Sequence, residues 1–64
     1  MKQTKKYVVA ITGTKKEGRD ISIITYLSPV LFQETQEQAK GIAFSYFMDR
    51  NPGYGIHSYV ISEI

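Results

Sequence analysis

The sequence predicts an α+β domain in which a three-stranded antiparallel sheet carries one amphipathic helix packed on one face, in the order β-β-α-β. Three observations predict this class. Two runs of β-branched and aromatic residues flank a polar segment that has a glycine at each end. A helical pattern with a capping residue follows them. A third β-type run then comes after Asn51-Pro52-Gly53, which is typical of a helix end.

The first two strands are expected at 7–12 and 21–27, where β-branched and aromatic side chains predominate. The segment 13–18 between them begins and ends with glycine, which adopts the positive φ that hairpin loops need. We therefore expect a β-hairpin with a basic tip. Pro29 cannot donate a hydrogen bond to a sheet, so it predicts a break, and 30–32 are expected to resume the strand beyond it.

A helix is expected to begin at Thr35, because its hydroxyl can cap the first turn and Gln38 can reach back to complete a capping box. The apolar residues that follow have the spacing of an amphipathic helix. The expected core face consists of Ala39, Ile42, Ala43, Tyr46 and Phe47. Gly41 costs about 1 kcal/mol relative to alanine and is interpreted as a point of close approach to the sheet. The last strand is expected at 56–62.

One helix covers one face of a sheet, yet period-two alternation places apolar residues on both faces. In the first strand, Tyr7, Val9 and Ile11 alternate with Val8 and Ala10. In the second strand, Ile21, Ile23 and Leu27 alternate with Ile24 and Tyr26. In the last strand, Ile56 and Val60 alternate with Tyr59 and Ile61. A monomer would leave one apolar face in water, which is typical of an interaction surface. The alternative is that loop 28–34 and the termini fold over it.

The 64-residue chain is expected to form a single domain over 1–64, in which 1–6 form a flexible basic arm. A domain of this size buries only about 60% of its unfolded surface, so self-association or docking on a partner would stabilise it. The absence of cysteine excludes disulfides and thiolate metal sites, and a single histidine cannot form a His-rich site. No apolar run is long enough to span a membrane, and the expected location is cytoplasmic.

The basic residues are concentrated at the start of the chain. Residues 1–19 contain six lysines and arginines against Glu17, a balance of about +5, whereas two basic and five acidic residues give 20–64 a balance of about −3. A patch of one sign attracts partners of the opposite sign. This charge asymmetry therefore indicates a partner with an acidic surface.

Few residues could perform catalysis. The strand that runs into Gly13 superficially suggests a nucleotide loop, but no dinucleotide fingerprint or P-loop is completed, which favours a hairpin turn. His57 is the only histidine, and its neighbour Ser58 would point to the opposite face of a strand, so no nucleophile–base pair is formed. We expect no enzyme, no catalytic or metal-binding residue, no cofactor and no small-molecule substrate.

The chain has five tyrosines, three of them in expected strands. Tyrosine is enriched at protein interfaces, and it also stacks on unpaired bases when basic residues lie nearby. The candidate binding residues are Lys5, Lys6, Tyr7, Lys15, Lys16, Arg19, Tyr26 and Tyr59. They predict a protein-binding module that docks on an acidic partner or self-associates. The alternatives are a small nucleic-acid-binding protein that uses the same residues, and a purely structural homo-oligomer.

The segment 32–39, Phe-Gln-Glu-Thr-Gln-Glu-Gln-Ala, followed by Ala43 and Tyr46, resembles small phage-encoded β-β-α-β proteins that act as host-modulating inhibitors or anti-defence proteins. These have a strand pair, a helix led by Glu-Thr with alanines every four residues, and a final strand. The resemblance implies an accessory protein of the host cytoplasm that binds and modulates a host macromolecule. Because the helix here carries Lys40 and the basic charge lies on the hairpin, the resemblance implies no particular partner.

Overall fold

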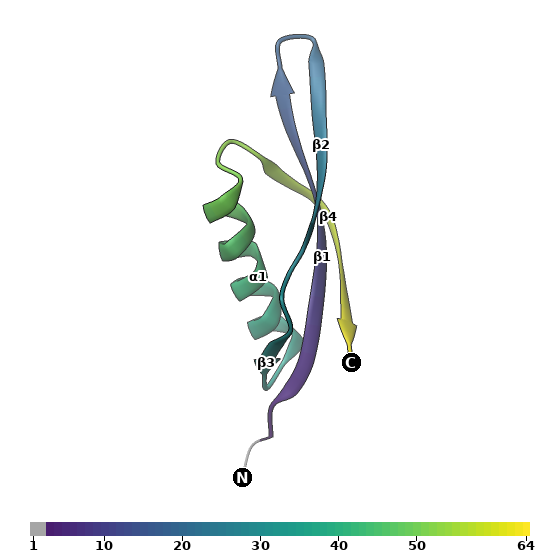
Figure 1. The fold of residues 1–64 in the computed structure, drawn as a ribbon, viewed down its shortest axis with the longest axis vertical. Coiled ribbons are helices and arrows are strands. Elements are labelled where there is room, and N and C mark those ends of the chain that lie inside the picture. The colour runs from purple at the N-terminus through teal and green to yellow at the C-terminus, as the bar shows by residue number, and fades with distance from the viewer. Residues whose placement is uncertain (1–2) are drawn as a thin grey trace.

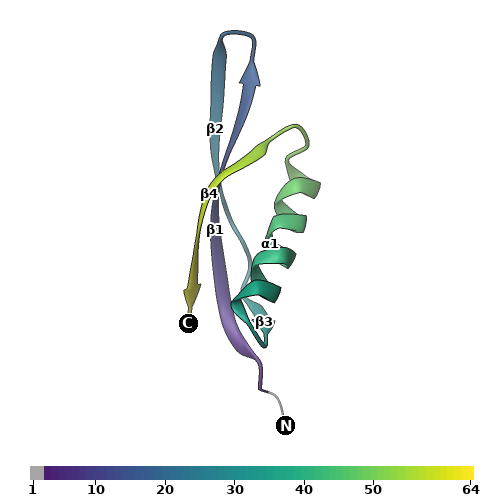
Figure 2. The ribbon, with the colours of Figure 1, turned by 180° about the vertical axis from the view of Figure 1, so that it is seen from behind.

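The computed structural model describes residues 3–64. Its elements are β1 (Lys5–Glu17), β2 (Asp20–Leu27), β3 (Leu31–Gln33), α1 (Gln36–Arg50) and β4 (Gly55–Glu63). β1 lies at the centre of an antiparallel sheet, with β2 and β3 following one another along one of its edges and β4 along the other (Figures 1 and 2). The α+β class, with an antiparallel sheet and one helix, is confirmed. The sheet has four strands rather than the expected three, because β3 is a separate short strand.

The β1–β2 hairpin is longer and its turn is tighter than the sequence predicts. Residues 13–17, expected in the loop, continue β1, and Glu17 pairs directly with Asp20. Only Gly18 and Arg19 form the turn, and Gly18 supplies its positive φ of 63°. Positive φ at the first of two central residues is the type II′ pattern, whose twist matches that of paired strands. The hairpin extends beyond α1 (Figure 1), giving a molecule of 52 × 17 × 15 Å.

The expected flexible arm over 1–6 is wrong for Lys5 and Lys6. Both belong to β1 and pair with Gln33 and Phe32 of β3. The first two residues lie outside the described part of the chain. Because β3 adds a backbone ladder to this end of β1, the lysine backbone is fixed although both residues are exposed.

Ser28 bridges the break between β2 and β3. The expected interruption at Pro29 is confirmed, because no strand residue occupies 28–30. The Ser28 N–H donates to the Val9 carbonyl oxygen at 2.9 Å, and the Ser28 Oγ accepts from the Val9 N–H at 2.9 Å. A side-chain oxygen thus replaces the ladder acceptor that a continuous strand would provide, and the edge of β1 stays paired across the proline break.

The expected capping box at the start of α1 is confirmed. The Gln38 N–H donates to Thr35 Oγ1 at 3.2 Å, and the Thr35 N–H donates to Gln38 Oε1 at 3.2 Å. At the other end, the backbone and side-chain N–H groups of Asn51 both donate to the Phe47 carbonyl oxygen, at 2.9 and 3.1 Å. Both helix ends therefore have partners for backbone groups that the helix itself leaves unpaired.

The buried stripe of α1 is narrower than the sequence predicts. Ala39, Ala43 and Phe47 are buried, at positions i, i+4 and i+8. Tyr46, expected in the core, is exposed, and the guanidinium of Arg50 lies 5.4 Å from the centre of its ring. The expected close approach at Gly41 is also wrong, because this residue is exposed and a Cβ there would meet no atom within 4 Å.

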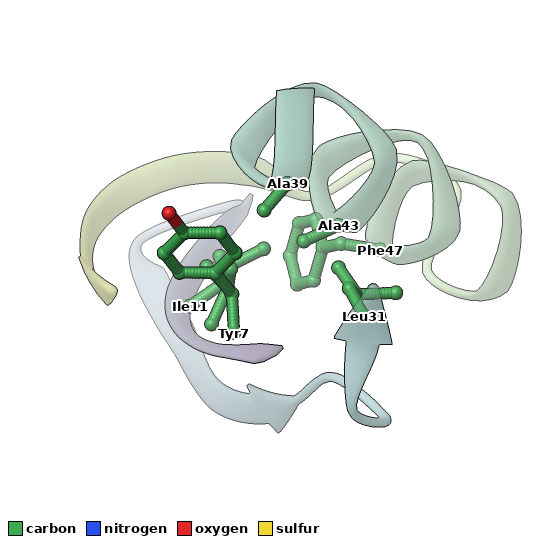
Figure 3. Packing of buried hydrophobic residues seen from close by; sticks show 7 residues of the cluster. Tyr7, Ile11, Leu31, Ala39, Ala43 and Phe47 are labelled. Atoms are coloured by element: carbon green, nitrogen blue, oxygen red, sulfur yellow. The ribbon is translucent and has the colours of Figure 1, made fainter. Parts of the chain in front are cut away.

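The core lies between α1 and the face of the sheet that α1 covers, called here the helix side (Figure 3). It consists of Tyr7, Val9, Ile11, Leu31, Ala39, Ala43 and Phe47. Gly13 is buried and continues the β1 row of the core instead of forming part of a loop. The β1–β4 register shifts between Thr12 and Gly13, where β4 has one extra residue, His57. This irregularity moves Ile56 to the helix side, although strict alternation groups it with Val60.

Candidate interaction surface

The face of the sheet opposite α1, called here the open face, carries a group of exposed apolar side chains. Residues paired across an antiparallel ladder lie on the same face of a sheet. The even-numbered residues of β1 lie on the open face, so their ladder partners in β2, β3 and β4 lie there as well. Its exposed apolar members are Ile21, Ile23, Leu27, Phe32 and Val60, and each is 58–66% exposed, whereas Val8 and Ala10 of β1 are half-buried on the same face. Exposed apolar groups concentrated on one face mark an interaction surface more strongly than scattered ones do.

The ladder residues of the open face carry only positive charge. By register, its charged residues among 3–64 are Lys6 and Lys16, roughly 33 Å apart along β1. Acidic residues lie elsewhere: Glu17, Asp20 and Glu63 are on the helix side, Glu34 precedes α1, and Glu37 and Asp49 are in α1. Between the two lysines, the non-apolar ladder residues of the open face are threonines, serines and Gly55. The open face is therefore an apolar strip with a positive charge near each end.

The three strand tyrosines proposed for binding all lie on the helix side. Tyr7 is 2% exposed beneath α1 and is part of the core, so it is not a surface residue. Tyr26 is half-buried, and its ring makes an edge contact with Phe47 at 6.0 Å between ring centres. Tyr59 is 43% exposed and makes an edge contact with Phe44 at 5.2 Å. The structure thus separates these tyrosines from the apolar strip.

The basic candidates are also divided between surfaces. Lys5 and Lys15 lie on the helix side, Lys6 and Lys16 on the open face, and Arg19 in the hairpin turn. Lys15 Nζ is 5.7 Å from the centre of the Tyr54 ring and 3.7 Å from Glu17 Oε1. Asp20 pairs with Glu17 across the hairpin. The tip therefore contains two carboxylates among its basic groups, and the eight candidate residues do not form one continuous site.

The outer edge of β4 is a second candidate surface, which sequence reasoning missed. β4 pairs with β1 along its inner edge, and no strand among residues 3–64 pairs with its outer edge. Edge strands are commonly protected from pairing by lysine, proline or a bulge. β4 has one irregularity, at His57, and beyond it the segment 58–63 contains neither lysine nor proline. A sheet edge becomes visible only when the strand order is known, so no local signal marks this surface.

Residues 3–64 form no pocket and contain no group of three or more side chains able to hold a metal ion. Over the same range, α1 lacks the length and apolarity needed to cross a membrane. Comparisons with protein-family models, with curated proteins and with solved structures give no match to this chain. The resemblance to phage-encoded modulators therefore remains a prediction from the sequence pattern.

Proposed function

We propose that the protein is a small non-enzymatic binding module whose open face docks on another protein. The observation that supports this function is the exposure of Ile21, Ile23, Leu27, Phe32 and Val60 on one face of the sheet. Removing apolar surface from water stabilises a complex by roughly 25 cal/mol per Å², before the costs of association are subtracted. The open face is thus the part of residues 3–64 with the most to gain from a partner.

The dimensions of the molecule support a partner of protein size. Its long outline, 52 × 17 Å, corresponds to a flat area near the roughly 800 Å² that each partner contributes to a standard protein interface. An interface of that kind would use most of the length of the sheet.

The charges on the open face indicate the chemistry of the partner. Lys6 and Lys16 favour a partner surface with carboxylates at both ends of an apolar strip. Two copies packed face to face would place lysines near lysines, with no acid from residues 3–64 between them. The occupant proposed here is therefore a different protein. The resemblance to host-modulating phage proteins supports the same class of function.

Site-specific photocrosslinking tests this function. A photoreactive amino acid at Ile23 on the open face should crosslink to one protein in the cells that make this chain. Met48 is the matched control, because it is a 49% exposed apolar residue of α1. The control should give no such product. Equal crosslinking from both positions would overturn the proposal. So would a crosslinked product that nuclease removes and that is lost when Lys15, Lys16 and Arg19 are neutralised, because this result would indicate nucleic acid as the partner.

Binding of the identified protein then tests the surface quantitatively. The double change Ile23→Ser and Leu27→Ser should abolish binding, whereas Met48→Ser should leave it intact. Changing Lys6 and Lys16 to alanine should slow association, most clearly at low salt, with little effect on dissociation, because exposed charges mainly steer encounter. Binding that tolerates the Ile23 and Leu27 changes would show that the open face is not the docking surface.

A further inference from the structure

The outer edge of β4 has a chemically palindromic sequence centred on Val60. Moving outward from this residue, the flanking pairs are Tyr59 and Ile61, Ser58 and Ser62, and His57 and Glu63. They join an aromatic to a β-branched residue, a hydroxyl to a hydroxyl, and a basic ring to a carboxylate. These are the kinds of cross-strand pair that stabilise antiparallel sheets.

We propose that two copies of the protein pair through the outer edges of β4, antiparallel and about a two-fold axis at Val60. Each copy places Tyr59 opposite the partner's Ile61, Ser58 opposite the partner's Ser62, and His57 opposite the partner's Glu63. The two-fold axis makes every such pair occur twice. This inference concerns the outer edge of β4 and does not depend on the proposed function, although Val60 belongs both to this edge and to the open face.

The faces of β4 are compatible with this register. Tyr59, Ile61 and Glu63 lie on the helix side, because they pair with Ile11, Val9 and Tyr7. The intervening residues Ser58, Val60 and Ser62 lie on the open face. Pairing about Val60 therefore opposes helix-side with helix-side residues and open-face with open-face residues. The two sheets become one, with both helices on the same side.

Neighbouring registers lack this match. An axis at Ile61 would place Tyr59 opposite the partner's Glu63, and Val60 opposite the partner's Ser62. An axis at Tyr59 would place Ser58 opposite the partner's Val60, and His57 opposite the partner's Ile61. Both registers oppose polar with apolar side chains, so the pair chemistry selects Val60 as the centre.

The fold leaves this edge accessible. α1 packs chiefly on β1 and β3, and the C-terminal half of β4 lies away from it (Figure 2). On the helix side, Phe44 and Lys40 of α1 contact the Tyr59 ring, and Tyr59 is nevertheless 43% exposed. His57 has no partner on β1, because Thr12 pairs with Ser58 and Gly13 with Ile56. It is therefore available to a second strand.

Cysteine crosslinking tests the position of the axis. The chain has no cysteine, so Val60→Cys introduces a single thiol at the proposed centre. There the Cβ atoms of the two copies would lie about 4.5–5.5 Å apart, close to disulfide geometry. This variant should form a disulfide dimer under mild oxidation. Ile23→Cys is the control, because Ile23 is equally exposed on the same face but lies on β2, across β1 from β4, and under the same oxidation it should form little disulfide-linked dimer.

Sedimentation equilibrium up to roughly 100 µM tests the free energy of pairing. The unmodified chain should have the mass of a dimer. Val60→Lys should raise the dimer Kd by roughly tenfold or more, because it opposes two lysines at the axis, whereas Ile23→Lys should change it less than about twofold. His57→Glu should weaken the dimer, and the added change Glu63→Lys should restore it. A strict monomer, or a dimer lost with Ile23→Lys but not with Val60→Lys, would overturn the proposal.

Discussion

The ring of Phe47 occupies the space in which a Cβ atom of residue 13 would lie. A Cβ built on Gly13 would overlap Cζ of the ring and would lie 3.0 and 3.2 Å from its two Cε atoms. Both residues are buried, and Phe47 is among the largest fully buried side chains of residues 3–64. The glycine thus allows the last turn of α1 to pack a full aromatic ring directly on the backbone of β1. This contact fixes how closely the helix and the sheet approach each other.

Gly13→Ala is predicted to destabilise the fold by about 1–3 kcal/mol, because it overpacks a core in which the ring cannot move without cost. Urea denaturation of the two proteins measures this difference. Gly13→Ala should cost less free energy of unfolding when Phe47 is already replaced by leucine, since the smaller side chain leaves room for the new methyl group. Strictly additive effects of the two changes would show that the contact does not limit packing.

Gly41→Ala is predicted to have the opposite effect. This glycine lies within α1, is exposed, and a Cβ there would meet no atom within 4 Å. Alanine should therefore stabilise the protein by up to about 1 kcal/mol through helix propensity alone. A higher midpoint of urea denaturation, with an unchanged slope, checks this expectation. Destabilisation would reveal a packing role for Gly41 that the structure does not show.

Local chemistry predicted the helix ends well, whereas tertiary packing decided the features that the sequence did not predict. The Thr35–Gln38 capping box depends on residues three positions apart, so the sequence alone defines it. The polar residues that follow Gly13 predict a loop at this position. The position of Gly13 in the core depends on Phe47, which is 34 positions away in the sequence. Tyr46 matched the helical period, but the narrow stripe of alanines leaves it outside the core.

The sequence predicts that the sheet has apolar faces, but it does not predict where the exposed surfaces lie. Alternation in the strands predicts that two faces are apolar, and the structure shows that one of them is exposed. Periodicity alone does not determine which set α1 covers, because helix and sheet meet through contacts between distant residues. The irregularity at His57 also moves Ile56 to the helix side, which a strict period of two does not predict. The edge of β4 follows only from the strand order.

The ion pair on α1 predicts a change in stability at high pH. Lys40 Nζ lies 3.0 Å from Glu37 Oε2, and this hydrogen bond, the Glu37 charge and, after them, Tyr59 raise the pKa of Lys40 above its ordinary value of 10.5. A raised pKa in the folded state gives a stabilisation that is fully present below 10.5 and lost as pH rises through the folded value. The melting temperatures of the unmodified protein and Lys40→Met should therefore differ by a constant amount at neutral pH and converge above pH 10.5. Glu37→Gln should remove most of that pH dependence, and a difference that persists to higher pH would contradict the assignment.

Removal of the Ser28 hydroxyl, in the break between β2 and β3, is predicted to destabilise the fold. Ser28 is 5% exposed, its Oγ accepts from the Val9 N–H, and its hydroxyl donates to the Pro29 carbonyl oxygen at 2.9 Å. Ser28→Ala would leave a buried N–H of the central strand without an acceptor, which costs about 1–3 kcal/mol. Ser45→Ala, at an exposed position of α1, is the control and should change stability by no more than about 0.5 kcal/mol. Hydrogen exchange distinguishes the mechanism from a general loss of packing: the Val9 amide should exchange faster in Ser28→Ala by more than the global loss of stability explains. Uniform acceleration of the core amides would instead mean that the hydroxyl contributes by filling space and not by pairing with Val9.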